Sequence, residues 1–345
     1  MTDPSAVRGI DAPRVTEWLA ARVPELAPPL QFDLIAGGHS NLTFAVTDAR
    51  GGRWVLRRPP LGQVLATAHD MGREHRIISA LAGTAVPVAP VVGLCEDPEV
   101  NGAPFYVMEF VDGIVVRGVD VAGALGPDVR RRAGESLVDV LARIHAVDVD
   151  AVGLGDLGRK EDYLARQLKR WYGQWELSKT RDLPAIDEVH AHLVAHAPTQ
   201  VGATIVHGDY RLDNCMISPD GDVIAVLDWE ICTLGDPLAD VGLLMVYWTD
   251  PDDAVANALV AATALEGFPR RADLAARYAE ASGRDLAELD VYTAFGYWKL
   301  ACIVEGVYAR YLGGAMGQRD PASFEGFKIQ VEHYADAARR LLGLT

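Results

Sequence analysis

Three polar side chains near the middle of the chain have the types and the spacing for combined proton and metal chemistry. Asp209 follows a short apolar run, Asn214 comes five residues later, and Asp228 ends a second apolar run. The intervening turn, Ser-Pro-Asp-Gly at 218–221, predicts a hairpin that brings Asn214 and Asp228 to the same end. One carboxylate can then accept a proton, while an amide oxygen and a second carboxylate suit a hard cation such as Mg²⁺. Phosphoryl transfer requires these parts.

The motif around these residues resembles a known family. His-Gly-Asp-x4-Asn at 207–214, followed by Asp-Trp-Glu at 228–230, is similar to the aminoglycoside phosphotransferase and choline kinase family. More narrowly, it resembles the kinase-like domain fused to some acyl-CoA dehydrogenases. Further matching stretches are Tyr-Val-Met-Glu-Phe-Val-Asp-Gly at 106–113, Leu-Ala-Arg-Ile-His at 141–145 and Leu-Gly-Asp-Pro-Leu-Ala-Asp at 234–240. The resemblance covers nearly the whole chain. It implies a protein-kinase-like, bilobal α+β fold, with a small β-rich N-lobe and a larger, mostly helical C-lobe.

The resemblance also implies a role for each motif residue. Asp209 is expected to be the catalytic base, and Asn214 and Asp228 the magnesium ligands. His207 and Asp240 are expected to brace the catalytic loop through hydrogen bonds. A plainer interpretation stays open for the last two residues, as an ordinary core histidine and a helix cap.

The nucleotide side departs from the kinase pattern at one position. Arg57 stands in the third strand where kinases carry a lysine that meets the phosphates. Strand alternation puts Val55 on the same face, toward adenine, and Arg58 on the opposite face, which we expect to meet solvent. Glu74 shares a helix face with apolar residues and should point inward, where its charge needs a partner. We expect that partner to be Arg57, a permanent cation with a planar fork.

Two further segments are candidates for nucleotide contacts. A Gly-Gly-His-Ser-Asn stretch at 37–41 lies between the first two predicted strands, where kinases cover the phosphates with a glycine-rich loop. Its amides and polar side chains could contact phosphate oxygens. The residues concerned are Ser40 and Asn41. The adenine edge is expected at the inter-lobe hinge, formed by Glu109, Phe110 and Val111.

Periodicity and turn signals place these motifs on secondary structure. Amphipathic patterns predict helices over 13–23, 70–81, 128–146, 162–175 and 184–196, and a largely helical region after 237. Extended patterns predict strands over 30–35, 42–47, 54–58, 91–95 and 105–110, and a short β-rich piece over 204–228. The first 111 residues therefore form the expected nucleotide-binding lobe with its leading helix. Residues 112–345 form the expected catalytic and substrate-binding lobe.

Composition narrows the class of protein. The chain has 345 residues, half of them apolar, and a net charge of −16, which argues against nucleic-acid binding. Its apolar runs are far shorter than the roughly 20 residues of a membrane helix. The residues 1–11 contain no basic start followed by an apolar run, so we expect no secretory signal. Four widely spaced cysteines fit a reducing cytoplasm.

Together these observations predict a phosphotransferase that uses ATP and Mg²⁺. Only seven residues separate Asp228 from Asp236, too few to dock a peptide, so the expected acceptor is a hydroxyl of a small molecule. A hydroxyacyl compound and an aminoglycoside-like alcohol are both compatible. The alternative is a non-catalytic nucleotide-binding pseudokinase or scaffold. ATP against GTP and the oligomeric state stay open. The candidate walls of the acceptor pocket are Trp248, Tyr292, Trp298, Glu305 and Tyr308.

Overall fold

The computed structural model describes residues 7–36, 41–61, 70–253, 261–314 and 320–344. The chain divides into two compact units. The first unit comprises 1–114, 215–219 and 223–230, and the second comprises 115–214, 220–222 and 231–345. The hairpin that carries Asp228 thus belongs to the first unit, whereas Asp209 and Asn214 belong to the second. The simpler division into 1–111 and 112–345 stays a prediction.

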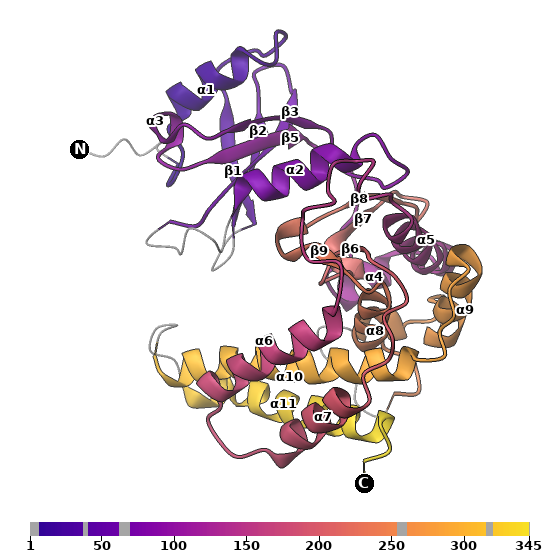
Figure 1. The fold of residues 1–345 in the computed structure, drawn as a ribbon. Coiled ribbons are helices and arrows are strands. Elements are labelled where there is room, and N and C mark those ends of the chain that lie inside the picture. The colour runs from indigo at the N-terminus through magenta and orange to yellow at the C-terminus, as the bar shows by residue number, and fades with distance from the viewer. Residues whose placement is uncertain (1–6, 37–40, 62–69, 254–260, 315–319, 345) are drawn as a thin grey trace. The chain divides into compact units, whose positions relative to one another are not determined.

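An antiparallel five-stranded sheet forms the centre of the first unit (Figure 1). Its spatial order is β1-β2-β3-β5-β4. The strands are β1 (Gln31–Ala36), β2 (Leu42–Thr47), β3 (Arg53–Arg58), β4 (Val91–Cys95) and β5 (Phe105–Glu109). The helices of this unit are α1 (Ala12–Ala20), α2 (Met71–Leu81) and the short α3 (Pro98–Asn101). The five predicted strands and the two longer helices are confirmed within a few residues, whereas α3 was not anticipated.

One face of β3 packs into the apolar core of the first unit. Trp54 and Leu56 point into an apolar core that also contains Val15 and Leu19 of α1. Arg58 lies on this face, as alternation requires. The expectation that it meets solvent is wrong, because its side chain is 6% exposed and donates to the carbonyl oxygens of Gly9 and Asn101. The buried Arg58 side chain therefore links two backbone segments that are distant in sequence.

Helix α2 packs against β4 and β5 and carries Glu74. The Asp70 side chain accepts a hydrogen bond from the Arg73 amide and so satisfies a free donor at the helix start. Glu74, Ile77 and Leu81 are buried along one stripe of the helix. The inward direction predicted for Glu74 is confirmed.

The predicted hairpin is present as β7 (Cys215–Ile217) and β8 (Val223–Val226). Cys215 pairs with Val226 and Met216 with Ala225 in antiparallel register. Gly221 in the connecting turn has φ +94°, a conformation that favours glycine. Cys215 is fully buried and acts as a small core residue.

The second unit is mostly helical, and α10 is its central helix. Helices α6, α7, α8 and α11 all pack against α10, and α5 packs against α9 (Figure 1). The helices are α4 (Val119–Ala124), α5 (Pro127–His145), α6 (Tyr163–Ser178), α7 (Pro184–Ala195), α8 (Leu238–Tyr247), α9 (Arg271–Ser282), α10 (Leu289–Leu312) and α11 (Glu325–Leu341). Two short strands, β6 (Thr204–Val206) and β9 (Thr233–Gly235), form an antiparallel pair. The short 3-10 turns of this unit are η1 (Leu212–Asn214), η3 (Ala261–Ala264) and η4 (Pro321–Ser323). A further turn, η2 (Trp229–Ile231), begins in the first unit and ends in the second.

The fold class expected from the sequence is confirmed: a β-rich N-terminal part is followed by a mostly helical part. Over the described ranges, every helix is too short or too polar to cross a lipid bilayer.

Candidate functional site

A buried carboxylate binds the backbone of the loop between β6 and β7. Asp240, in the first turn of α8, is 1% exposed and accepts hydrogen bonds from the backbone amides of His207 (2.6 Å) and Gly208 (2.8 Å). Gly208 has φ +86°, and a Cβ there would come within 3.1 Å of the Ile231 side chain. The motif therefore needs glycine at 208 and an acceptor at 240 to set the backbone that leads into Asp209.

Asp240 has a third buried neighbour. The Nε2 atom of His145 lies 3.3 Å from its carboxylate, and the Nδ1 atom lies 2.7 Å from the hydroxyl of Tyr278. Burial alone would raise the pKa of Asp240, but the His145 ring and the Gly208 amide outweigh it and hold the pKa below its usual value. Burial also lowers the pKa of His145, which favours the neutral form of its ring. A proton on Nε2 then satisfies both neighbours.

His207 lies inside the loop that it was expected to brace. Its ring is fully buried, and its Nδ1 atom lies 3.4 Å from the amide nitrogen of Asp209, which donates to it. The bracing roles of His207 and Asp240 remain predictions of function. Their hydrogen bonds are those that such roles require.

The Asp209 carboxylate is oriented by partners on both oxygens. The Asn214 side-chain nitrogen donates to Oδ2 (2.9 Å) and to the Asp209 carbonyl (2.9 Å). The Tyr247 hydroxyl donates to Oδ1 (2.7 Å), and Arg211 Nε lies 3.5 Å from Oδ2. Burial and the carboxylate raise the pKa of Tyr247, so the phenol stays protonated and serves as a donor. Asp209 nevertheless keeps 26% of its side chain exposed.

Asn214 fits the role of a metal ligand. Because its nitrogen donates both hydrogen bonds to Asp209, the orientation of the amide leaves its oxygen as an acceptor. An amide oxygen is a ligand that Mg²⁺ accepts.

The first unit contains a cluster of three carboxylates around Arg57, which we call the Arg57 cluster: Arg57, Glu74, Asp228 and Glu230. Arg57 Nε lies 3.2 Å from Glu74 Oε2, and Nη2 lies 2.5 Å from Asp228 Oδ1 and 3.8 Å from Glu230 Oε2. The expected pairing of Arg57 with Glu74 is confirmed. Glu230, which also accepts from the Asn41 side chain at 3.2 Å, had not been given a role of its own.

Burial and neighbouring charges act in opposite directions within the Arg57 cluster. Loss of water raises the pKa of Glu74 to about 7, against the opposing pull of Arg57. The surrounding carboxylates overcome the same loss of water at Arg57 and raise the pKa of its guanidinium, so the side chain stays charged. Arg57 therefore favours the ionised form of Glu74, in a site where only 2% of the Glu74 side chain is exposed.

Asp228 has an unusual backbone conformation. Its φ is +62°, and among described residues other than glycine only Asp162 shares a positive φ. Such strain is held by the surrounding structure and is concentrated at functional sites. The side chain is 32% exposed and binds Arg57 through Oδ1, which leaves Oδ2 as a further oxygen ligand. Asp228 therefore also fits a hard cation.

The other residues expected to contact the nucleotide lie on or beside the strands β2, β3 and β5. Val55 is buried on the Arg57 face of β3 and Asn41 precedes β2, whereas Ser40 lies outside the described residues. At the end of β5, the Glu109 amide donates to the Pro90 carbonyl (2.8 Å) and the Phe110 amide to the Arg53 carbonyl (3.3 Å). Any adenine contact at this hinge would then fall to other backbone groups, such as those of Val111. The nucleotide contacts remain predictions.

The expected walls of the acceptor pocket are wrong for at least three residues. Trp248 and Trp298 are buried and donate through their indole nitrogens to the carbonyls of Pro269 (2.9 Å) and Ile186 (3.0 Å). Glu305 is fully buried and binds Thr180 and Arg181. These side chains stabilise helix packing and offer no surface to a ligand.

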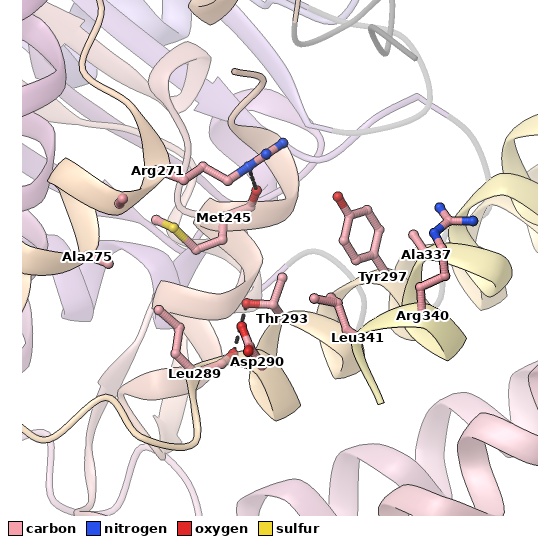
Figure 2. A pocket seen from close by; sticks show the side chains of 11 residues that line it. Met245, Arg271, Ala275, Leu289, Asp290, Thr293, Tyr297, Ala337, Arg340 and Leu341 are labelled. Atoms are coloured by element: carbon pink, nitrogen blue, oxygen red, sulfur yellow. Dashed lines mark hydrogen bonds between the residues drawn. The ribbon is translucent and has the colours of Figure 1, made fainter. Parts of the chain in front are cut away.

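Two cavities of the second unit lie away from Asp209. One, of about 460 Å³, lies among α8, α9, α10 and α11, where Tyr297 and Arg340 border an open space (Figure 2). The other, of about 670 Å³, is lined by Tyr163, Gln200, Asp236 and Tyr292 among others. Neither cavity is lined by Asp209 or Asn214.

The sequence of this chain is similar to known proteins. Residues 31–289 match the model of the phosphotransferase enzyme family. Acyl-CoA dehydrogenase family member 10 of Mus musculus is 37% identical over 83% of this chain, and family member 11 of Homo sapiens is 32% identical over 83%. The chain spans only 27% and 37% of the length of these relatives.

Solved structures extend the similarity to the fold. A crystal structure from Ralstonia eutropha, assigned to the aminoglycoside phosphotransferases, matches with a TM-score of 0.80 and 34% identity, over 96% of this chain and 98% of that one. The GDP complex of an aminoglycoside 2'-phosphotransferase-IIIa variant matches with a TM-score of 0.64 at 15% identity, over 96% and 99%, and this shows the fold alone. On the family match and these relatives, the chain belongs to the phosphotransferase enzyme family, also called APH.

Proposed function

We propose that this protein transfers the γ-phosphoryl group of ATP to a hydroxyl of a small molecule. The observation that carries the proposal is the Asp209 carboxylate, oriented by Asn214 and Tyr247 on a loop whose backbone Asp240 holds. Two further findings support it: the family match, and the complexes of structural neighbours with GDP and ADP.

In this mechanism the protein mainly positions and neutralises charge. Asp209 accepts the proton of the acceptor hydroxyl as its oxygen bonds to the γ-phosphorus and the bond to the β-phosphate oxygen breaks. The products are ADP and a phosphate ester, and the proton leaves later from Asp209 to solvent. Asn214 and Asp228 each offer an oxygen ligand to Mg²⁺, which when bound neutralises phosphate charge. Arg57 offers a forked cation to the phosphates.

A small acceptor is favoured by the segment after Asp228. The seven residues that follow form the turn η2 and the strand β9, and this leaves no long segment that could dock a peptide. The acceptors we propose for testing are hydroxyacyl compounds and aminoglycoside-like alcohols. Their respective motivation is the similarity to acyl-CoA dehydrogenase family members and to aminoglycoside phosphotransferases.

The second candidate function is a pseudokinase that binds nucleotide without turnover. Its support is the departure from lysine at Arg57, whose guanidinium contacts Asp228 directly. The oriented Asp209 and Asn214 pair argues for catalysis, because a protein that only binds nucleotide has no need of a base.

The first prediction concerns the base. Asp209→Asn should keep ATP affinity and lose about two to four decades of kcat, the usual contribution of a general base. ADP release in the presence of an acceptor measures turnover, and calorimetry measures binding. Asp139→Asn, a partly buried carboxylate paired with Arg277 in the same unit, is the matched control and should retain activity. Near-normal kcat in Asp209→Asn would remove the assignment.

The second prediction concerns Arg57. Arg57→Lys should lower kcat by about ten-fold or more, because lysine cannot reproduce the forked contacts with phosphate and carboxylates. Arg57→Ala should also cost roughly 1–3 kcal/mol of stability, since Glu74 is left buried without its cation.

Arg58→Lys is the neighbouring control for this arginine. It should lower the melting temperature, because Arg58 clamps backbone on the opposite face, and leave kcat per folded molecule unchanged. A kcat that is indifferent to Arg57→Lys would favour the pseudokinase.

The third prediction concerns the metal. Mg²⁺ or Mn²⁺ should support transfer and Zn²⁺ should not be required, since Asn214 and Asp228 offer oxygen ligands only. Mn²⁺ binding followed by electron paramagnetic resonance should weaken in Asn214→Ala and in Asp228→Asn. Full activity after exhaustive chelation would contradict the metal requirement.

A further inference from the structure

A charged side chain occupies the core of the second unit next to the catalytic loop. Lys299 lies in the middle of α10 and is only 6% exposed. Phe295 and Cys302, about one turn away on the same helix, are buried apolar residues. An ammonium group in such a place loses most of its hydration, so a leucine or methionine would be cheaper to bury. A buried lysine at this position therefore requires local contacts that compensate the loss of hydration.

The ammonium makes one strong contact. Lys299 Nζ donates to the carbonyl oxygen of Gly208 at 3.0 Å, and it lies 5.8 Å from the ring centre of Trp171 on α6. Burial lowers the pKa of Lys299, while the carboxylates of Asp209 and Asp240 act in the opposite direction. The ammonium group thus lies against a backbone carbonyl, and two carboxylates of the same unit favour its charged form.

The position of that carbonyl matters. It belongs to the peptide group that joins Gly208 to Asp209, whose amide donates to His207. The two preceding peptide groups are those held by Asp240 through the His207 and Gly208 amides. Three successive peptide groups are thereby fixed: Asp240 accepts from the N–H groups of the first two, and Lys299 donates to the carbonyl of the third.

We propose that Lys299 is a positioning residue that holds the peptide group before Asp209 and so aligns its carboxylate with the acceptor hydroxyl. The proposal rests on the proposed function of Asp209 as base. Nζ is too buried to reach a ligand, which excludes a direct catalytic role. A displacement of about 1 Å at a reacting group can cost about a hundred-fold in rate, so loss of this anchor should be visible in kcat.

The test replaces the ammonium without changing the volume of the core. Lys299→Met should lower kcat by about 10- to 100-fold and leave the Kd of Mg²⁺–ATP within about two-fold. Lys299→Arg, which keeps a cationic donor, should recover part of the loss. Leu300→Met, at the next buried position of α10, is the matched control and should keep both values. If Lys299→Met does not fold, Lys299→Gln takes its place with the same expected directions.

A second measurement does not depend on turnover. Amide hydrogen exchange over residues 207–210 should quicken by about ten-fold or more in Lys299→Met and stay unchanged in Leu300→Met. Unchanged exchange together with unchanged kcat per folded molecule would overturn the proposal, even if the melting temperature falls. Loosened exchange in Lys299→Met alongside a fully active Asp209→Asn would instead refute the base and keep the anchor.

Discussion

The buried carboxylate of Asp240 is the constraint on which the loop between β6 and β7 depends. It is 1% exposed and is compensated by two backbone amides and by the ring of His145. A carboxylate buried this deeply is costly unless its lone pairs are satisfied, so the loop must adopt the one path that supplies both amides. That path requires the positive φ of Gly208 and delivers Asp209 with its carboxylate toward Asn214 and Tyr247. The residues of the motif thus form one connected hydrogen-bond network.

In the Arg57 cluster of the first unit, the central group is a cation, and the groups that compensate its charge are carboxylates. One guanidinium serves Glu74 on α2, Asp228 after β8 and Glu230 beyond it. A lysine could serve these groups only as a point charge, whereas the planar fork reaches Glu74 through Nε and Asp228 through Nη2. The departure from lysine is therefore a coherent local arrangement. A phosphate group bound to Arg57, as proposed above, would have to compete with Asp228 for the same cation.

Local patterns in the sequence predicted what depends on neighbours along the chain. Alternation placed Arg57 opposite Arg58, the helix stripe turned Glu74 inward, and the turn at 218–221 defined the hairpin. Packing between distant segments could not be read in this way. Arg58 is buried by residues about forty to fifty positions away, and Trp298 turned into the helical core instead of a pocket. Lys299 and Tyr247 gave no signal beyond a polar residue in an apolar helix, because their partners lie far away in sequence.

The central claim is that the chain moves a phosphoryl group from ATP to a small hydroxylated molecule. Its most direct test is to incubate the protein with Mg²⁺, ATP labelled in the γ-phosphoryl group and a library of hydroxylated metabolites, hydroxyacyl compounds and aminoglycosides included. Mass spectrometry then searches for the label in a small molecule. The account predicts a labelled phosphate ester that forms with the wild-type protein and is nearly absent with Asp209→Asn. Tight ATP binding with no labelled ester from any acceptor would contradict it and establish the chain as a nucleotide-binding pseudokinase.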